Sequence, residues 1–325
     1  MRIAVVIPCF RVRAHVLDVL THMPPAVHRV YVVDDCCPES SGQWVQEQCQ
    51  DPRVQVLWHD ENQGVGGAVR TGYQAALADG LDIVVKVDGD GQMDPALIPL
   101  FTRPIERGRA DYTKGNRFYR PESLKGMPAV RLIGNAALSF ITKLSTGYWP
   151  NMDPTNGYTA IHAEVLRRLP LDKLEPRYFF ETDMLYHLNI IRAVVRDVPM
   201  DAIYADEQSS LKVSRVLPEF MLKHLNRLFK RYVYVYLLRD FNIGSLYSVL
   251  GLLLCLGGGL FGAIHWLHGM ATGQPASSGT VMLAALPLII GIQFLIAFLH
   301  HDVSSVPSEP LSQLADEWKL YPPTT

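Results

Sequence analysis

The chain has 325 residues, of which 48% are hydrophobic and 19% charged, and its formal net charge is −2. This length allows one large domain or two small ones, and the slightly acidic balance excludes a general nucleic-acid binder, which needs a basic surface. Five cysteines without a C-x-x-C pair indicate a reducing compartment. The apolar run at residues 1–10 is too short for a signal peptide and predicts a buried strand. We therefore expect the catalytic part in the cytoplasm.

The first half of the chain alternates short apolar runs with amphipathic stretches. Four runs rich in Val and Ile are expected to be strands: Ile3–Ile7, Arg29–Val33, Val54–Trp58 and Ile83–Val87. Helical patterns lie between them, at Ala14–Met23 and Gly67–Asp79. Strands that alternate with helices predict βαβ units, and hence an α/β fold with a mostly parallel sheet.

Two of these predicted strands end in acidic clusters, Asp34-Asp35 and Asp88-Gly89-Asp90. Ligands bind beyond the carboxyl ends of the strands in open α/β sheets, so both clusters lie where chemistry is expected. The carboxylates of Asp88 and Asp90 can hold a divalent metal, Mg²⁺ or Mn²⁺, that bridges the phosphates of a nucleotide diphosphate. Such a metal stabilises the charge on a leaving phosphate. An Asp-x-Asp also occurs in simple turns, which is the alternative interpretation.

Basic and apolar side chains alternate between Leu211 and Asp240. The apolar residues recur at spacings of three and four, which is the pattern of an amphipathic helix. Beside a membrane span, a basic helix of this kind can lie in the interface and attract anionic headgroups. A solvated helix on the domain surface is the alternative.

Two apolar segments follow, Ile243–Leu267 and Thr280–Leu299, and neither contains Asp, Glu, Lys or Arg. Each is long enough for a helix that spans a bilayer, although a buried hairpin in a soluble core is the alternative. The basic run before the first segment places both ends of the hairpin in the cytoplasm. We expect four parts, the last of them poorly ordered: a catalytic domain at 1–210, basic amphipathic juxtamembrane helices at 211–242, two transmembrane helices at 243–300 and a cytoplasmic tail at 301–325.

A series of further motifs surrounds the Asp-x-Asp in a definite order. They are Pro8-Cys9-Phe10, Val32-Val33-Asp34-Asp35, Asn62-Gln63-Gly64-Val65-Gly66-Gly67-Ala68, Lys114-Gly115-Asn116-Arg117-Phe118 and Asp153-Pro154-Thr155-Asn156-Gly157-Tyr158. The glycine-rich turn lacks the G-x-G-x-x-G spacing of a dinucleotide site. The whole set resembles glycosyltransferase family 2, and the two apolar segments resemble its membrane-anchored branch, which glycosylates dolichyl or polyprenyl phosphates. The resemblance implies a GT-A fold, with one nucleotide-sugar-binding α/β domain.

The resemblance also implies roles for individual residues. The nucleotide-binding candidates are Pro8, Asp34, Asp35, Gly64 and Asp88, and the metal candidates are Asp88 and Asp90. Basic side chains must hold two anionic phosphates close together, and the candidates are Arg117, Arg131, Lys212 and Arg215. The catalytic candidates, which orient sugar hydroxyls or stabilise developing positive charge, are Asp153, Glu181 and Asp183. Favourable capping of a helix start is the alternative for the last two.

We therefore expect an inverting glycosyltransferase that moves a hexose, with UDP the favoured carrier, to a polyprenyl monophosphate at the cytoplasmic face of the inner or plasma membrane. A phosphate monoester is largely dianionic at neutral pH, so it needs no strong base. A hydroxyl acceptor on a diacylglycerol, ceramide or lipid-linked sugar would need a carboxylate base. A non-catalytic scaffold that binds nucleotide-sugar is a further alternative. We expect membrane lipids and a second copy of the chain as partners, and no nucleic acid.

Overall fold

The computed structural model describes residues 1–119, 129–201 and 213–314, with the backbone alone for the helical residues 129–133 and 213–217. The chain divides into two compact units. The first contains Met1–Arg227 together with Pro307–Thr325, and the second contains Leu228–Val306. We describe each unit by itself.

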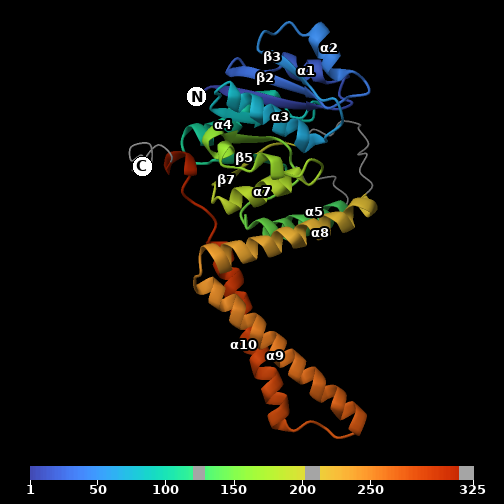
Figure 1. Cartoon of the computed structure of the whole chain (residues 1–325), viewed down its shortest axis with the longest axis vertical. Helices are drawn as coiled ribbons and strands as arrows, with labels where there is room; N and C mark the ends of the chain where they lie inside the picture. The colour runs from blue at the N-terminus through green and yellow to red at the C-terminus, as the bar shows by residue number, and fades with distance from the viewer. Residues whose placement is uncertain (120–128, 202–212, 315–325) are drawn as a thin grey trace. The chain divides into compact units, whose positions relative to one another are not determined.

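The first unit is built on a sheet with the strand order β3-β2-β1-β4-β6-β5-β7 (Figure 1). The strands are β1 Ile3–Cys9, β2 Val27–Asp34, β3 Val54–Trp58, β4 Ile83–Lys86, β5 Tyr112–Asn116, β6 Thr159–His162 and β7 Val195–Pro199. Only β6 runs against the others, since it pairs antiparallel with both β4 and β5. The mostly parallel sheet predicted from the sequence is confirmed, and the four predicted strands begin and end within two residues of β1 to β4.

Helices cover both faces of this sheet. They are α1 Val16–Thr21, α2 Ser41–Gln48, α3 Val65–Ala78, α4 Ile98–Glu106, α5 Ala129–Thr146, α6 Ala163–Arg167 and α7 Phe180–Ile190. The side chains of β1 alternate between the two faces, as in any strand. Val6 lies against Gly72 of α3, whereas Val5 belongs to the cluster that contains Ile98 of α4. The sheet is therefore the middle of three layers, which explains why β1 is apolar on both faces.

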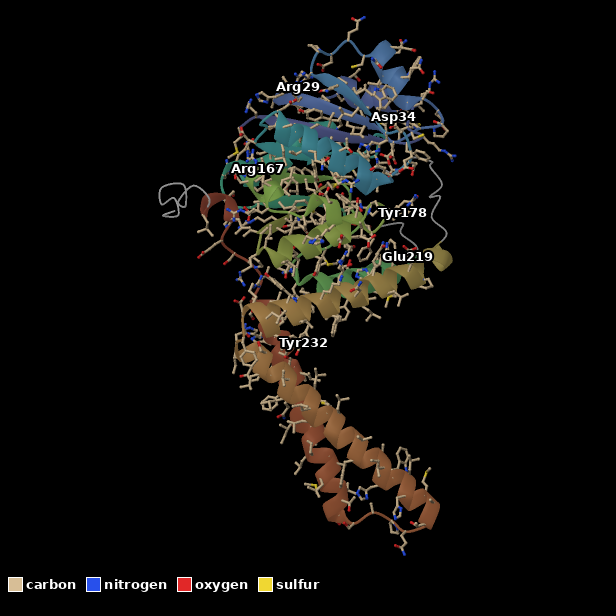
Figure 2. All side chains as sticks on the ribbon, viewed as in Figure 1. Arg29, Asp34, Arg167, Tyr178, Glu219 and Tyr232 are labelled. Carbon is tan, nitrogen blue, oxygen red and sulfur yellow. The ribbon has the colours of Figure 1, made fainter. Side chains whose placement is uncertain are left out.

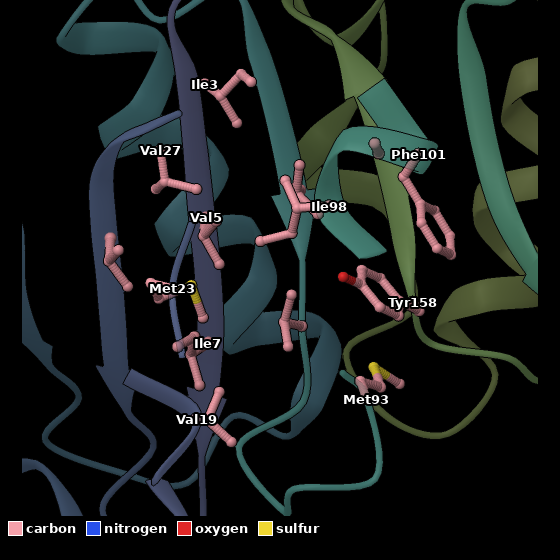
Figure 3. Close-up of a cluster of buried hydrophobic side chains, with 14 of the residues drawn as sticks. Ile3, Val5, Ile7, Val19, Met23, Val27, Met93, Ile98, Phe101 and Tyr158 are labelled. Atoms are coloured by element: carbon pink, nitrogen blue, oxygen red, sulfur yellow. The ribbon is translucent and has the colours of Figure 1, made fainter. Parts of the chain in front are cut away.

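The hydrophobic core lies between the sheet and α4 (Figure 3). Val5 and Ile7 of β1 point into it, and Ile98 and Phe101 of α4 close it from the other side. Phe101 stacks on Tyr158, with ring centroids 4.0 Å apart and an interplanar angle of 12°. Tyr158 also donates a hydrogen bond of 3.0 Å to the Asp94 carbonyl, so the core is joined to the loop that follows the Asp-x-Asp.

The second unit contains two long apolar helices, α9 Ile243–Thr272 and α10 Ser278–Ser304. Both are long and apolar enough to cross a membrane, by length and composition. Glycine lets them pack closely, because a Cβ at Gly258 would lie 2.9 Å from the Ala284 carbonyl and one at Gly291 would lie 2.7 Å from Cys255 Sγ. The two helices extend past the predicted apolar segments at their carboxyl ends.

A buried ion pair lies within the second unit, outside the apolar segments. Arg231 donates to both oxygens of Asp302, at 2.7 and 2.9 Å, and Tyr236 donates to the same carboxylate at 2.6 Å. Arg231 lies near the end of α8 Val213–Tyr232, and Tyr236 lies in the π-helix η4 Val233–Arg239. The predicted amphipathic helix over Leu211–Asp240 is therefore partly corrected, since Val233–Arg239 form a wider π-helical turn.

The segment after α10 is not poorly ordered as predicted, within its described residues. The Asp111 carboxylate accepts hydrogen bonds from the backbone N–H groups of Leu311 at 2.8 Å and Ser312 at 2.9 Å. It also accepts one from Val194 at 2.8 Å, and Asp111 is fully buried. A buried carboxylate that accepts three N–H bonds stabilises the segment where it leaves the second unit. The remainder of the tail, residues 315–325, lies outside the described residues.

Replacing Asp111 by Ala should release this segment. The change leaves three backbone donors without an acceptor, each at a cost of about 1–3 kcal/mol, so we expect a lower unfolding temperature and faster proteolysis within residues 305–314. Asp111→Asn keeps one acceptor oxygen and should show an intermediate effect. Unfolding and proteolysis rates of Asp111→Ala that equal those of the wild type would contradict this account of the segment.

Candidate active site

A buried lysine, Lys86, lies at the end of β4, two residues before the Asp-x-Asp. Lys86 Nζ is 2.7 Å from Asp88 Oδ1 and 3.3 Å from Glu181 Oε1 on α7. The Lys86 side chain is 1% exposed, whereas those of Asp88 and Glu181 are 30% and 15% exposed. Burial alone would lower the pKa of Lys86, but the two carboxylates outweigh this effect and raise it. Lys86 therefore remains a cation that joins the metal candidate Asp88 to the catalytic candidate Glu181.

Glycine at position 157 makes room for this cluster. A Cβ there would lie 2.4 Å from Lys86 Nζ and 2.7 Å from Asp88 Oδ2. The next residue, Tyr158, fills the core beside Phe101. The Asn156-Gly157-Tyr158 motif thus has a steric function that the sequence does not reveal. Its glycine leaves space for the side chains of Lys86 and Asp88, and its tyrosine stacks on Phe101 in the core.

The acidic pair after β2 organises the loops at the same end of the sheet, where Figure 2 labels Asp34. Asp34 accepts hydrogen bonds from the backbone N–H groups of Cys37 at 2.7 Å and Gly42 at 2.6 Å. Asp35 accepts from those of Gln63 and Gly64, each at 2.8 Å. The His59 ring, buried with it, lies 2.7 Å from Asp35. Both carboxylates are buried and accept hydrogen bonds from the protein itself, and their predicted contact with a nucleoside stays a prediction.

The glycine-rich turn at the start of α3 is closed by another part of the chain. The Pro176 carbonyl accepts hydrogen bonds from Gly66 N–H at 2.9 Å and Gly67 N–H at 3.3 Å. A Cβ at Gly66 would lie 2.3 Å from the Glu175 carbonyl, and one at Gly64, where φ is +82°, would lie 2.5 Å from that of Pro176. These N–H groups at a helix start, which could otherwise bind a phosphate, are bonded to the protein. The glycines are required by close backbone approach.

Arg117 and Asp153 form a bidentate ion pair. Arg117 Nε and Nη2 each donate to Asp153 at 2.7 Å, and Arg117 N–H donates at 3.1 Å. Asp153 is buried with a left-handed φ of +54°, a conformation that costs energy and is held by these contacts. Burial raises the pKa of Asp153, but its bonds to Arg117 outweigh that effect and lower it. We predicted Asp153 to act on the sugar, whereas in the structure its oxygens hold the Arg117 side chain.

Asp183 faces α8. Its Oδ1 is 2.6 Å from Arg227 Nε, and its Oδ2 accepts from the Glu175 N–H at 2.9 Å. Burial raises the pKa of Asp183 to about 6, against the opposing effect of Arg227. Glu181, two residues earlier on α7, instead faces Lys86. Of the two acidic candidates on this helix, Glu181 is thus the one that the structure brings to Asp88.

The remaining predicted residues are placed as follows. Pro8 lies at the end of β1 opposite Val33, beyond the last residue that pairs with β4, so the missing N–H of proline costs no bond there. Lys212 lies outside the described residues. Arg131 and Arg215 lie on α5 and α8, and only their backbone is described. Their predicted roles at the phosphates stay predictions.

The two carboxylates of the Asp-x-Asp fit a metal ion whose remaining ligands come from the substrate and from water. Asp88 and Asp90 are both partly exposed, and Asp90 Oδ1 accepts from Gln92 N–H at 3.0 Å. Within the described residues, His, Cys, Asp and Glu form no group of three that could hold a metal ion. Mg²⁺ and its analogues are commonly bound by one or two carboxylates together with phosphate oxygens and water. Asp88 and Asp90 would supply these two carboxylates.

Sequence analysis missed Lys86, His59 and Glu175. The only signal for Lys86 was a lysine within a run of Val and Ile directly before the Asp-x-Asp. Its partner Glu181 is distant in the sequence, and nothing local indicates the pairing. His59 and Glu175 carried no signal of their own, because both act through contacts with other loops.

Comparison with solved structures identifies the fold class. Glucosyl-3-phosphoglycerate synthase from Mycobacterium tuberculosis, in complex with UDP, matches with a TM-score of 0.53 at 18% identity, over 70% of this chain and 80% of that one. The same enzyme in complex with Mn²⁺ and UDP-glucose matches with a TM-score of 0.52 at 20% identity, over 70% and 79%. The first unit therefore has the GT-A fold that the resemblance implied.

Comparison of sequences identifies the family. Residues 4–169, about half of the chain, match Glycosyl transferase family 2. The UDP-N-acetylglucosamine–dolichyl-phosphate N-acetylglucosaminyltransferase of Methanococcus voltae is 34% identical over 154 residues, which cover 47% of this chain and 61% of the relative. The undecaprenyl-phosphate mannosyltransferase of Micrococcus luteus is 30% identical over 205 residues, which cover 62% and 83%. The chain belongs to glycosyltransferase family 2.

A pair of Gly→Ala changes tests the packing of the glycine-rich turn. Alanine normally stabilises a helix by about 1 kcal/mol relative to glycine. Gly66→Ala should instead destabilise the protein, by about 1–3 kcal/mol, because its Cβ would meet the Glu175 carbonyl and the Phe180 ring. Gly134→Ala on α5 is the matched control, since a Cβ there meets nothing within 4 Å. Equal thermal stability of the two variants would contradict this account of the turn.

Proposed function

We propose that this protein transfers a hexose from a nucleotide-sugar, with UDP the favoured carrier, to a polyprenyl monophosphate, with inversion at the anomeric carbon. An acceptor phosphate oxygen forms the new bond to the anomeric carbon as the bond to the nucleotide diphosphate breaks. The names of the two sequence relatives, which contain dolichyl phosphate and undecaprenyl phosphate, support this class of acceptor.

The observation that carries the proposal is the pairing of all three catalytic candidates with cations. Asp153 lies against Arg117, Glu181 against Lys86 and Asp183 against Arg227. A cation makes a carboxylate a weaker base, and Arg117 lowers the pKa of Asp153 in this way, although burial raises the pKa of Glu181 and Asp183 in spite of their partners. A hydroxyl acceptor requires a base. A phosphate monoester is already dianionic at neutral pH, so it needs only to be held near the donor.

The residues at the strand ends have distinct roles in this proposal. Asp90, with Asp88 beside it, would hold a divalent metal together with the donor diphosphate. When bound, such a metal neutralises charge on the leaving diphosphate. Lys86 pairs with Asp88 and Glu181, and the role proposed for Glu181 is to accept a hydrogen bond from the sugar. Arg117, Arg131, Lys212 and Arg215 are the proposed phosphate-binding side chains.

The chain is proposed to be anchored in the inner or plasma membrane by α9 and α10. The segments that precede and follow the second unit in the sequence both belong to the first unit, and we propose on this ground that both ends of the helix pair lie on the same membrane face. The excess of Lys and Arg before α9 favours the cytoplasmic face. We also propose a homo-oligomer; a monomeric mass in mild detergent at working concentration would contradict that part.

One observation favours the alternative of a hydroxyl acceptor. Burial raises the pKa of Glu181 in spite of Lys86, and a carboxylate with a raised pKa is better suited to accept a proton at neutral pH. Glu181→Gln separates the two cases. With a phosphate acceptor the amide still bonds to the sugar, and kcat should fall by less than about a hundredfold; with a hydroxyl acceptor it should fall by 10²–10⁴-fold or more.

The transfer reaction itself is tested with labelled sugar from UDP- and GDP-sugars and with undecaprenyl phosphate in the membrane phase. We expect lipid-linked product that requires Mg²⁺ or Mn²⁺, is abolished by chelator and falls at least a hundredfold in Asp90→Ala. Asp94→Asn is the matched control, because Asp94 caps the following turn by accepting from Ala96 N–H and is exposed. Its activity should stay within a few-fold of the wild type.

The other outcomes distinguish the alternatives. Product on diacylglycerol or ceramide, and none on the polyprenyl phosphate, would replace the acceptor while keeping the fold and the metal residues. No turnover of any donor with any lipid would contradict the enzymatic proposal and favour a scaffold that binds nucleotide-sugar.

A further inference from the structure

Lys223 and Arg227 of α8 form ion pairs with Glu175, and these two pairs, which we call the Glu175 clamp, hold this part of α8 on the first unit. Lys223 Nζ lies 2.8 Å from Glu175 Oε2, and Arg227 Nη2 lies 3.9 Å from Oε1. Arg227 also binds Asp183, which accepts from the Glu175 N–H. Each of these side chains is at most 26% exposed, a setting in which ion pairs are worth more than on the surface. Both the side chain and the backbone of Glu175 are therefore fixed.

The residue after Glu175 closes the glycine-rich turn. The Pro176 carbonyl accepts from Gly66 and Gly67, and the backbone of this segment passes so close to Gly66 that no Cβ fits between them. The same turn binds Asp35 through Gly64 N–H. A displacement of Glu175 thus moves the acceptor of two hydrogen bonds at the start of α3, next to the loop that the acidic pair holds. Figure 2 labels Tyr178 and Glu219, which lie near this segment in the chain and on α8.

Three apolar side chains of α8 are exposed and lie along one stripe of the helix. Leu222, Leu225 and Phe229 are 68%, 55% and 68% exposed, and they recur at spacings of three and four. Lys223 and Arg227, which clamp Glu175, alternate with them along the helix. One helix therefore carries an apolar stripe suited to a lipid surface and, beside it, the two cations that bind Glu175.

We propose that Glu175 is a positioning residue: the contact of α8 with Glu175 sets the affinity for the donor nucleotide. The inference rests on the proposed function, since it needs a nucleotide that binds at the strand ends. Lys223 and Arg227 fix Glu175, and the carbonyl of the next residue, Pro176, fixes the glycine-rich turn. The turn and Asp35 together then shape the part of the site that binds the donor nucleotide. Loss of the clamp weakens donor binding without touching a residue that contacts the donor.

The test is nucleotide binding by the full chain in lipid nanodiscs, measured by titration calorimetry with Mn²⁺ and with UDP and GDP in turn. For the nucleotide that the wild type binds, Glu175→Gln and Lys223→Met should each raise Kd about tenfold. The double variant should raise Kd by less than the product of the two single effects, because both changes remove the Lys223–Glu175 pair. Donor KM should rise in parallel, with KM for the acceptor unchanged.

Glu219→Gln is the matched control. Glu219 also binds Lys223, at 3.0 Å, but its side chain is 62% exposed and on the outer side of the clamp, so Kd should stay within twofold of the wild type. A lower unfolding temperature with an unchanged Kd in Glu175→Gln and Lys223→Met would overturn the proposal, since it would show a purely structural clamp. A wild-type chain that binds neither nucleotide would instead contradict the proposed function.

Discussion

The buried ammonium of Lys86 is the constraint on which the site depends. An unpaired charge in the centre of a three-layer domain would cost several kcal/mol, so the fold must supply anionic partners around it. Asp88 supplies one from the loop after β4, and Glu181 supplies the other from the first turn of α7. Gly157 leaves the space that the cluster occupies. Three segments far apart in the sequence are thereby brought together at one strand end, and the metal candidate Asp88 is held beside a fixed positive charge.

The same pattern of paired charges recurs around the site. Arg117 with Asp153 and Arg227 with Asp183 each join a cation to a buried carboxylate, as Lys86 does with Glu181. Breaking such a pair leaves an uncompensated charge, which makes each of them a rigid point of the structure. Rigid, preorganised charges suit the attack of an acceptor phosphate on the anomeric carbon of a nucleotide-sugar, because the two anions must be held close without reorganisation of the protein. This is why we favour a phosphate acceptor.

Local patterns in the sequence predicted most of the fold. Runs of Val and Ile predicted β1 to β4, amphipathic patterns predicted α1, α3 and most of α8, and length without charge predicted α9 and α10. The sequence also placed Asp88 and Asp90 at a strand end, because that position follows from a parallel sheet. Contacts across the sequence could not be predicted. The pairing of Lys86 with Glu181, the closure of the glycine-rich turn by Pro176 and the capture of Leu311 by Asp111 each depend on how segments pack, and no local pattern encodes them.

The central claim is that Asp88 and Asp90 bind a metal only together with a nucleotide diphosphate, because Lys86 already neutralises Asp88 and the described residues supply no third ligand beside them. Electron paramagnetic resonance of Mn²⁺ titrated into the full chain, with and without UDP or GDP, tests it most directly. We predict one tight Mn²⁺ site that appears only with the nucleotide and disappears in Asp90→Ala. Tight Mn²⁺ binding without nucleotide, or binding that survives Asp90→Ala, would contradict the account.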